Sequence, residues 1–129
     1  MARVLVVEDD FDAREAIAAR LREARHRVVT AHDATAALAM VKQIGNPDVY
    51  VVDVGLPSMD GFEFVRRATD GDRPVPTVYL TRRSAVRPPS AGAGDTFLTK
   101  PFPPGELLDT IQSLIDRTVA EAGQLESGW

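Results

Sequence analysis

The fold is decided by one stretch of the sequence, residues 47–57, which reads Pro47-Asp48-Val49-Tyr50-Val51-Val52-Asp53-Val54-Gly55-Leu56-Pro57. Its centre is an apolar, mostly β-branched run, and such a run is typical of a strand that is buried on both faces. The run ends at Asp53, and a Gly-x-Pro turn follows at once. A carboxylate in this position either lies at the ligand-binding edge of an open α/β sheet or caps the turn, and Asp53 alone leaves both roles open.

Strand-like and helix-like patterns alternate along the rest of the chain. Apolar runs predict further strands over residues 3–7, 27–31, 75–80 and 95–99. Helical spacing predicts helices between and after these strands, with Asp10 and Asp33 as the N-caps of the first two. One connection differs: residues 83–94 contain Pro88-Pro89 and two glycines, so we expect a weak or irregular fourth helix there.

The helical spacing also indicates which side chains face the core. The expected inward residues are Ala13, Ile17, Leu21 and Ala24 in the first helix, Ala34, Ala37, Leu38, Val41 and Ile44 in the second, Phe62, Val65 and Ala68 in the third, and Leu107, Leu108, Ile111, Ile115 and Val119 in the last. His26 and His32 flank the second strand, and we expect both on the surface.

The repeated strand–helix order predicts an α/β domain with a single doubly wound, five-stranded parallel sheet and helices on both faces. One common strand order for such a sheet is 2-1-3-4-5, and it places the ligand site between the first and third strands. We assign residues 1–119 to this domain and residues 120–129 to a C-terminal tail.

Composition excludes several classes of function. The chain has 15 Lys and Arg against 19 Asp and Glu, a net charge of −4, so direct binding to nucleic acid is not expected. There is no cysteine, which excludes disulfides, thiolate metal sites and cysteine nucleophiles and fits a protein of the reducing cytoplasm. No apolar run approaches the roughly 20 residues of a membrane span, so no contact with a membrane is expected.

Under the 2-1-3-4-5 order, several polar side chains converge on one edge of the sheet. Glu8 and Asp9 would face Asp53, because neighbouring strands lie about 4.8 Å apart. Protonation or a cation relieves the repulsion of three such carboxylates, and ligands that are all oxygen suit a hard ion such as Mg²⁺. Thr81 and Lys100 follow the fourth and fifth strands at the same edge. A nucleophilic carboxylate, a hard cation, a hydroxyl and an ammonium group together predict a phosphoryl-transfer site.

These motifs resemble the receiver domain of two-component response regulators, the CheY-like superfamily. The matching segments are residues 4–10, 53–61, 80–81 and 98–102, and they occur in the family's order. Each motif alone is weak, but together they are specific, and the resemblance covers nearly the whole chain.

The resemblance implies a role for each carboxylate and for the turn after Asp53. Asp53 matches the phosphoacceptor, which takes a phosphoryl group from the phosphohistidine of a histidine kinase or a histidine phosphotransfer protein. Asp9 matches a direct Mg²⁺ ligand, and Glu8 matches the acidic partner that acts through water. Gly55 matches the residue that offers its backbone carbonyl to the metal.

The resemblance also implies how phosphorylation would be signalled. Lys100 matches the lysine that pairs with phosphoryl oxygens, and its bond to Pro101 is expected to be cis. Thr81 matches the hydroxyl that moves onto the phosphate, and Phe97 matches the aromatic switch that turns inward with it, which changes binding to a downstream partner. Such a domain catalyses only its own phosphorylation and dephosphorylation and is not otherwise an enzyme.

One residue beside the expected site departs from the family pattern. The residue after the threonine is usually small, whereas here it is Arg82. Its side chain either shields Asp53 from water and small phosphodonors or extends into solvent, and the sequence leaves both open. Shielding would slow phosphorylation by acetyl phosphate and prolong the life of the phosphoryl group.

Two other functions remain open on the sequence. A receiver-like interaction module that is not phosphorylated is favoured only by Arg82. A Mg²⁺-dependent phosphohydrolase with an aspartyl intermediate needs a second acid two residues beyond the nucleophile, where this chain has Gly55. A dinucleotide-binding role is disfavoured because no G-x-G-x-x-G motif follows the first strand.

Overall fold

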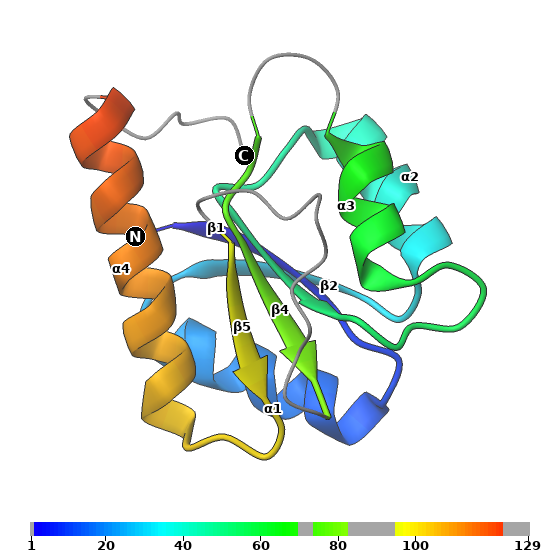
Figure 1. The fold of residues 1–129 in the computed structure, drawn as a ribbon, viewed down its shortest axis with the longest axis horizontal. Helices are drawn as coiled ribbons and strands as arrows, with labels where there is room; N and C mark the ends of the chain where they lie inside the picture. Colours follow the sequence, from blue (N-terminus) through cyan, green and yellow to red (C-terminus); the bar gives the residue numbers. More distant parts are fainter. Residues whose placement is uncertain (1, 70–73, 83–94, 123–129) are drawn as a thin grey trace.

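The computed structural model describes residues 2–69, 74–82 and 95–122. Five parallel strands form one sheet in the order β2-β1-β3-β4-β5, which confirms the predicted architecture (Figure 1). The elements are β1 (Arg3–Val7), α1 (Phe11–Glu23), β2 (Arg27–Ala31), α2 (Ala34–Ile44), β3 (Val49–Asp53), α3 (Gly61–Ala68), β4 (Thr77–Thr81), β5 (Thr96–Thr99) and α4 (Pro104–Ala122). The weak helix expected over residues 83–94 lies outside the described residues.

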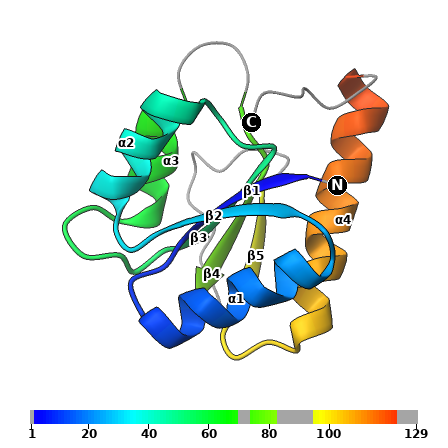
Figure 2. The same ribbon diagram turned by 180° about the vertical axis from the view of Figure 1, so that it is seen from behind.

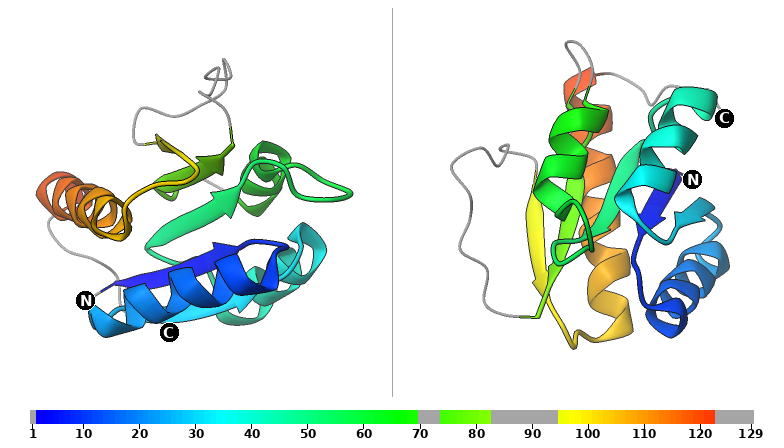
Figure 3. Two further views of the ribbon diagram at one scale, coloured as in Figure 1. Left: turned by 90° about the horizontal axis from the view of Figure 1, so that it is seen from below. Right: turned by 90° about the vertical axis from the view of Figure 1, so that its right-hand side faces the viewer.

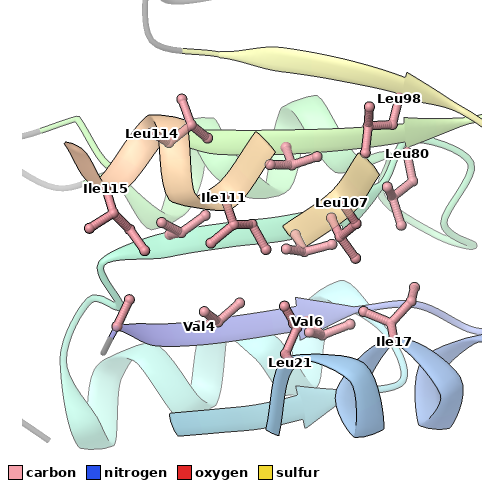
Figure 4. Packing of buried hydrophobic residues seen from close by; sticks show 14 residues of the cluster. Val4, Val6, Ile17, Leu21, Leu80, Leu98, Leu107, Ile111, Leu114 and Ile115 are labelled. Carbon is pink, nitrogen blue, oxygen red and sulfur yellow. The ribbon is translucent and has the colours of Figure 1, made fainter. Parts of the chain in front are cut away.

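Helices cover both faces of the sheet. Figures 2 and 3 show α1 and α4 on one side and α2 and α3 on the other. Alternate residues of a strand point to opposite faces, so Val4 and Val6 of β1 pack with α1 and α4 (Figure 4), whereas Leu5 and Val7 pack with α2 and α3. All four are fully buried. The middle positions of the central strands are therefore apolar because both faces are covered, and their polar residues lie at the strand ends.

Side-chain caps set the beginnings of the helices. The backbone N–H of Ala13 donates to Asp10 at 2.8 Å, and that of Ala36 donates to Asp33 at 2.7 Å, which confirms both predicted N-caps. Gly45 ends α2 with a φ of 84°, a conformation that favours glycine. β4 begins at Thr77, later than predicted, because Pro76 has no N–H to contribute to the sheet.

Some of the predicted inward positions are wrong. Ile44 is 41% exposed and Ala24 is exposed, since both lie at the last turn of a helix where the chain leaves the sheet. In α3 the fully buried aromatic side chain is that of Phe64, while Phe62 is only half-buried. Leu114 of α4 is buried and was not predicted. The side chain of Val119 lies outside the described residues.

His26 is buried, so its predicted place on the surface is wrong. Its imidazole Nδ1 accepts a hydrogen bond from the backbone N–H of Ala2 at 3.2 Å, and burial lowers its pKa. The turn between α1 and β2, where Arg25 has a φ of 70°, directs His26 inward against the start of β1. His32 is exposed, as predicted.

The C-terminal helix continues past the predicted domain boundary. α4 ends at Ala122, and residues 123–129 of the predicted tail lie outside the described residues. The division at residue 119 stays a prediction. None of the helices in the described part of the chain is both long and apolar enough to cross a membrane.

Candidate functional site

The register of the sheet brings the predicted site residues to one edge. Val7 pairs with Val52, so Glu8 follows β1 at the level where Asp53 ends β3. Beyond the last pair of β4 and β5, the N–H of Lys100 donates to the carbonyl of Thr81 at 2.6 Å. Glu8, Asp53, Thr81 and Lys100 therefore share the carboxyl edge of the sheet, as the sequence predicts. The Lys100–Pro101 peptide is cis, as the resemblance implies.

Lys100 links the two buried carboxylates of this edge. Its ammonium group donates to Oε1 of Glu8, and its Nζ lies 3.2 Å from Oδ2 of Asp53. Glu8 is fully buried and Asp53 is only 7% exposed. Buried charges need partners, and here one cation neutralises part of the charge on two acids.

The Asp53 carboxylate is held in one orientation by its neighbours. The backbone N–H of Gly55 donates to Oδ1 at 3.0 Å, while Oδ2 faces Lys100. Gly61, at the start of α3, lies so close to the end of β3 that a Cβ there would be 2.6 Å from the carbonyl oxygen of Asp53. Only glycine permits this approach, which places the turn after β3 tightly against the site.

The loop that carries Glu8 is held by a residue that the sequence analysis did not identify. The guanidinium of Arg14 donates to the carbonyl of Glu8 at 2.9 Å, and the same group lies 5.4 Å from the ring centre of Phe11. Arg14 is one turn beyond the N-cap Asp10, so its side chain reaches back over the end of β1. This helical spacing is the signal that could have identified Arg14.

The surroundings of Glu8 and Asp53 shift the pKa values of these two acids in opposite directions. Burial and the hydrogen bond with Asp53 raise the pKa of Glu8 to about 7, although Lys100 acts in the opposite direction. Burial alone would raise the pKa of Asp53, but the hydrogen bonds from Glu8 and Gly55 and the charge of Lys100 lower it overall. Burial disfavours the charged form of Lys100, yet Glu8 and Asp53 raise its pKa. Asp53 is thus the charged carboxylate and Glu8 is the one that takes up a proton near neutral pH.

Three acidic residues could hold a metal ion. Glu8, Asp9 and Asp53 each offer a carboxylate oxygen, and these oxygens lie within 4.8 Å of one another. Oxygen ligands without nitrogen or sulfur fit a hard divalent cation such as Mg²⁺. Burial and Asp53 raise the pKa of Glu8, and a cation bound beside it would favour its charged form.

A cavity opens onto Asp53 from solvent. Its volume is about 380 Å³, and it is lined by Asp9, Asp53, Val54, Gly55, Thr81 and Arg82. Arg82 is exposed, whereas Thr81 is half-buried. The structure therefore places Arg82 at the same opening as Asp9 and Asp53.

Phe97 belongs to an aromatic cluster that the sequence analysis did not identify. Its ring stacks on that of Tyr79, with centroids 5.1 Å apart and an interplanar angle of 26°. The ring of Phe62 in α3 contacts both rings, with its centroid 4.7 Å from that of Tyr79 and 5.9 Å from that of Phe97. Tyr79 pairs with Phe97 in the sheet and points to the same side of β4 as Thr81. The cluster thus connects Phe97 to the strand that carries Thr81.

Comparisons with known proteins agree with this geometry. The profile of the response regulator receiver domain matches residues 4–112. The transcriptional regulatory protein PhoP of Escherichia coli is 37% identical over 129 residues, 97% of this chain and 57% of PhoP. TrcR of Mycobacterium tuberculosis, also a transcriptional regulatory protein, is 35% identical over 119 residues, 90% of this chain and 46% of TrcR.

A solved structure has the same fold along most of its length. The chemotaxis protein CheY4 of Vibrio cholerae superposes with a TM-score of 0.75 at 32% identity, covering 88% of this chain and 98% of CheY4. The chain spans about half the length of the curated relatives it matches. The profile match, the strand order and the acidic edge lead to one conclusion: the chain belongs to the family of response regulator receiver domains.

Proposed function

We propose that Asp53 accepts a phosphoryl group from the phosphohistidine of a histidine kinase or a histidine phosphotransfer protein, in a reaction that requires Mg²⁺. One observation carries the proposal: Asp53 is a charged, oriented carboxylate at a solvent-accessible cavity, with the ammonium group of Lys100 at 3.2 Å. Charge develops on the transferring group in phosphoryl transfer, so a fixed cation at this distance favours the reaction.

In the proposed step, a carboxylate oxygen of Asp53 forms a bond to phosphorus as the bond from phosphorus to the donor imidazole breaks. The electron pair of the broken bond stays on the imidazole. Lys100 pairs with the phosphoryl oxygens, and the hydroxyl of Thr81, which lines the same cavity, donates to them once the group is attached. The N–H of Gly55 keeps Asp53 in its orientation.

The acidic cluster is the proposed metal site. Asp9 and Asp53 would hold Mg²⁺ directly, Glu8 would act through water, and Gly55 would offer its backbone carbonyl. The bound ion would neutralise charge on the transferring phosphoryl group. The close approach of the three carboxylates supports this assignment.

We further propose that Phe97 is the aromatic switch, and that its change of position alters binding to a downstream protein. The stacking of Phe97 on Tyr79 supports a coupling to β4, because movement of Thr81 toward a phosphoryl group would disturb a strand that Phe97 contacts. The negative net charge supports a protein partner rather than nucleic acid, and the lack of cysteine supports a cytoplasmic location.

Mass spectrometry of the intact protein tests the proposed function. After incubation with Mg²⁺ and either a kinase or acetyl phosphate, we expect the mass of one added phosphoryl group, and none in Asp53→Ala. Removal of Mg²⁺ with a chelator before the donor is added should prevent the modification. An unmodified protein with both kinds of donor would favour the unphosphorylated interaction module, while a hydrolase is disfavoured by Gly55 and by family membership.

A further inference from the structure

We propose that Arg82 binds the phosphoryl group carried by Asp53 and prolongs its lifetime. The inference rests on the proposed function, and it starts from the position of the side chain. Arg82 lines the cavity that opens onto Asp53, together with its neighbour Thr81 and the small residue Gly55. A phosphoryl group on Asp53 would enter the cavity that Arg82 lines.

Arg82 is also available to a ligand. It is exposed, and among the side chains that the structure describes no carboxylate forms an ion pair with it, although Asp9 lines the same cavity. Lys100 pairs with Glu8 and Asp53 in the unmodified site, so Arg82 is a second cation at the cavity. A guanidinium presents paired N–H donors that match the oxygens of a phosphoryl group.

The charge balance of the site favours the phosphorylated state as the ligand of Arg82. With a divalent cation bound, the three charged carboxylates of Glu8, Asp9 and Asp53 are balanced by the cation and Lys100. A phosphoryl group on Asp53 replaces one negative charge with about two, which leaves the site with an excess negative charge. The charge of Arg82 offsets that excess, so Arg82 stabilises the product more than the unmodified site.

A contact of this kind would slow hydrolysis of the phosphoryl group. A guanidinium bound to the phosphoryl oxygens would hinder the approach of water to phosphorus and would hold these oxygens in their ground-state position. Since Arg82 is exposed, the effect is limited by solvent, and we expect a change of about three- to tenfold in the rate of loss.

The test is the rate of loss of phosphoryl from Asp53 after the donor is removed, with Mg²⁺ present. Arg82→Ala and Arg82→Met should both lose the group about three- to tenfold faster than the parent protein. Arg82→Lys, which retains the charge but lacks the paired N–H donors of the guanidinium, should lose the group at a rate between those of these variants and the parent. Arg117→Ala, an exposed arginine on α4, serves as the matched control and should not change the rate.

A second measurement reports on affinity rather than lifetime. The affinity for beryllofluoride, a phosphoryl mimic, should fall by about three- to tenfold in Arg82→Ala and Arg82→Met but not in Arg117→Ala. If Arg82→Met keeps the parent lifetime and affinity, the side chain acts by bulk alone and the proposal is overturned. A phosphorylated parent with an unchanged Arg82→Ala would overturn this inference only, whereas a parent that never carries phosphoryl would overturn the proposed function as well.

Discussion

The Nζ atom of Lys100 lies 3.2 Å from Oδ2 of Asp53, although the two residues are 47 positions apart in the sequence. Asp53 ends β3 and Lys100 follows β5, with β4 between them. The contact therefore depends on the order of the strands and on the lysine side chain reaching across the end of β4. Because the same ammonium group donates to Glu8, Lys100 joins three strands at the edge where phosphoryl transfer is proposed.

Replacing Lys100 by Met should slow phosphorylation of Asp53 by about 100-fold, because the site loses a fixed cation where charge develops. Lys100→Arg should retain part of the rate. The initial rate of phosphoryl incorporation from a small donor, followed by mass spectrometry, measures the change. The control is Lys42→Met, since Lys42 is exposed on α2. Equal rates for Lys100→Met and the parent would remove Lys100 from the proposed mechanism.

Much of the site could be predicted because it follows from topology. Parallel strands joined by helices end at one edge, so polar residues after the strands meet there once the strand order is known. Glu8, Asp53, Thr81 and Lys100 each follow or end an apolar run, and the structure brings them together. The N-caps Asp10 and Asp33 were predictable for a local reason, since each bonds a backbone N–H only three residues away.

The features that escaped prediction depend on contacts between distant segments or on side-chain direction. His26 is buried against the start of β1, where the backbone N–H of Ala2, 24 residues away, donates to its ring. Phe62 and Phe64 are both apolar and two positions apart, and only the rotation of α3 on the sheet decides that Phe64 enters the core while Phe62 contacts Tyr79. No local pattern carries that information.

Binding of Mg²⁺ should release a proton from Glu8. The pKa of Glu8 is raised to about 7, so below that pH the acid is protonated in the metal-free protein, and a nearby cation favours its charged form. We expect close to one proton released per ion at about pH 6 and close to none at about pH 8. Titration calorimetry in two buffers of different ionisation enthalpy measures this number.

Glu8→Gln is the control for that titration, because it keeps the size of the side chain but has no proton to release.

The Glu8 carboxyl also makes the metal-free protein less stable as pH rises. The pKa of Glu8 is higher in the folded state than its ordinary value of 4.5, so its stabilising contribution is complete below about pH 4.5 and is lost as pH rises through about 7. Glu8→Gln should not lose stability over this pH range. In the Mg²⁺ titration, proton release from Glu8→Gln equal to that of the parent would mean that another group releases the proton.

Gly61→Ala should destabilise the fold by about 1–3 kcal/mol. An added Cβ would lie 2.6 Å from the carbonyl oxygen of Asp53 and 2.8 Å from Cγ1 of Val52, so the start of α3 would have to shift away from β3. Urea unfolding monitored by circular dichroism measures the free energy. Gly105→Ala is the matched control, since a Cβ there meets nothing within 4 Å and alanine favours a helix. Equal stabilities of the two variants would show that the contact at Gly61 is tolerated.

The opposite edge of the sheet offers a test that separates stability from function. There the side chain of Arg3 pairs with Asp48 at 2.7 Å, and Asp48 also accepts the backbone N–H of Arg3 at 2.8 Å. The side chains are only 10% and 8% exposed, so Asp48→Ala removes the carboxylate that pairs with a largely buried cation and should cost about 3–5 kcal/mol. Asp48→Asn, which still accepts hydrogen bonds, should cost less.

Because Arg3 and Asp48 lie at the starts of β1 and β3, the full strand length separates them from Asp53. In conditions where Asp48→Asn remains folded, its rate of phosphorylation at Asp53 should therefore equal that of the parent, while its urea midpoint is lower. Chemical denaturation and phosphoryl incorporation, measured on the same preparation, give both quantities. A fall in rate without unfolding would mean that the strand transmits a change from one edge of the sheet to the other, contrary to the rigid core that the packing of β1 and β3 implies.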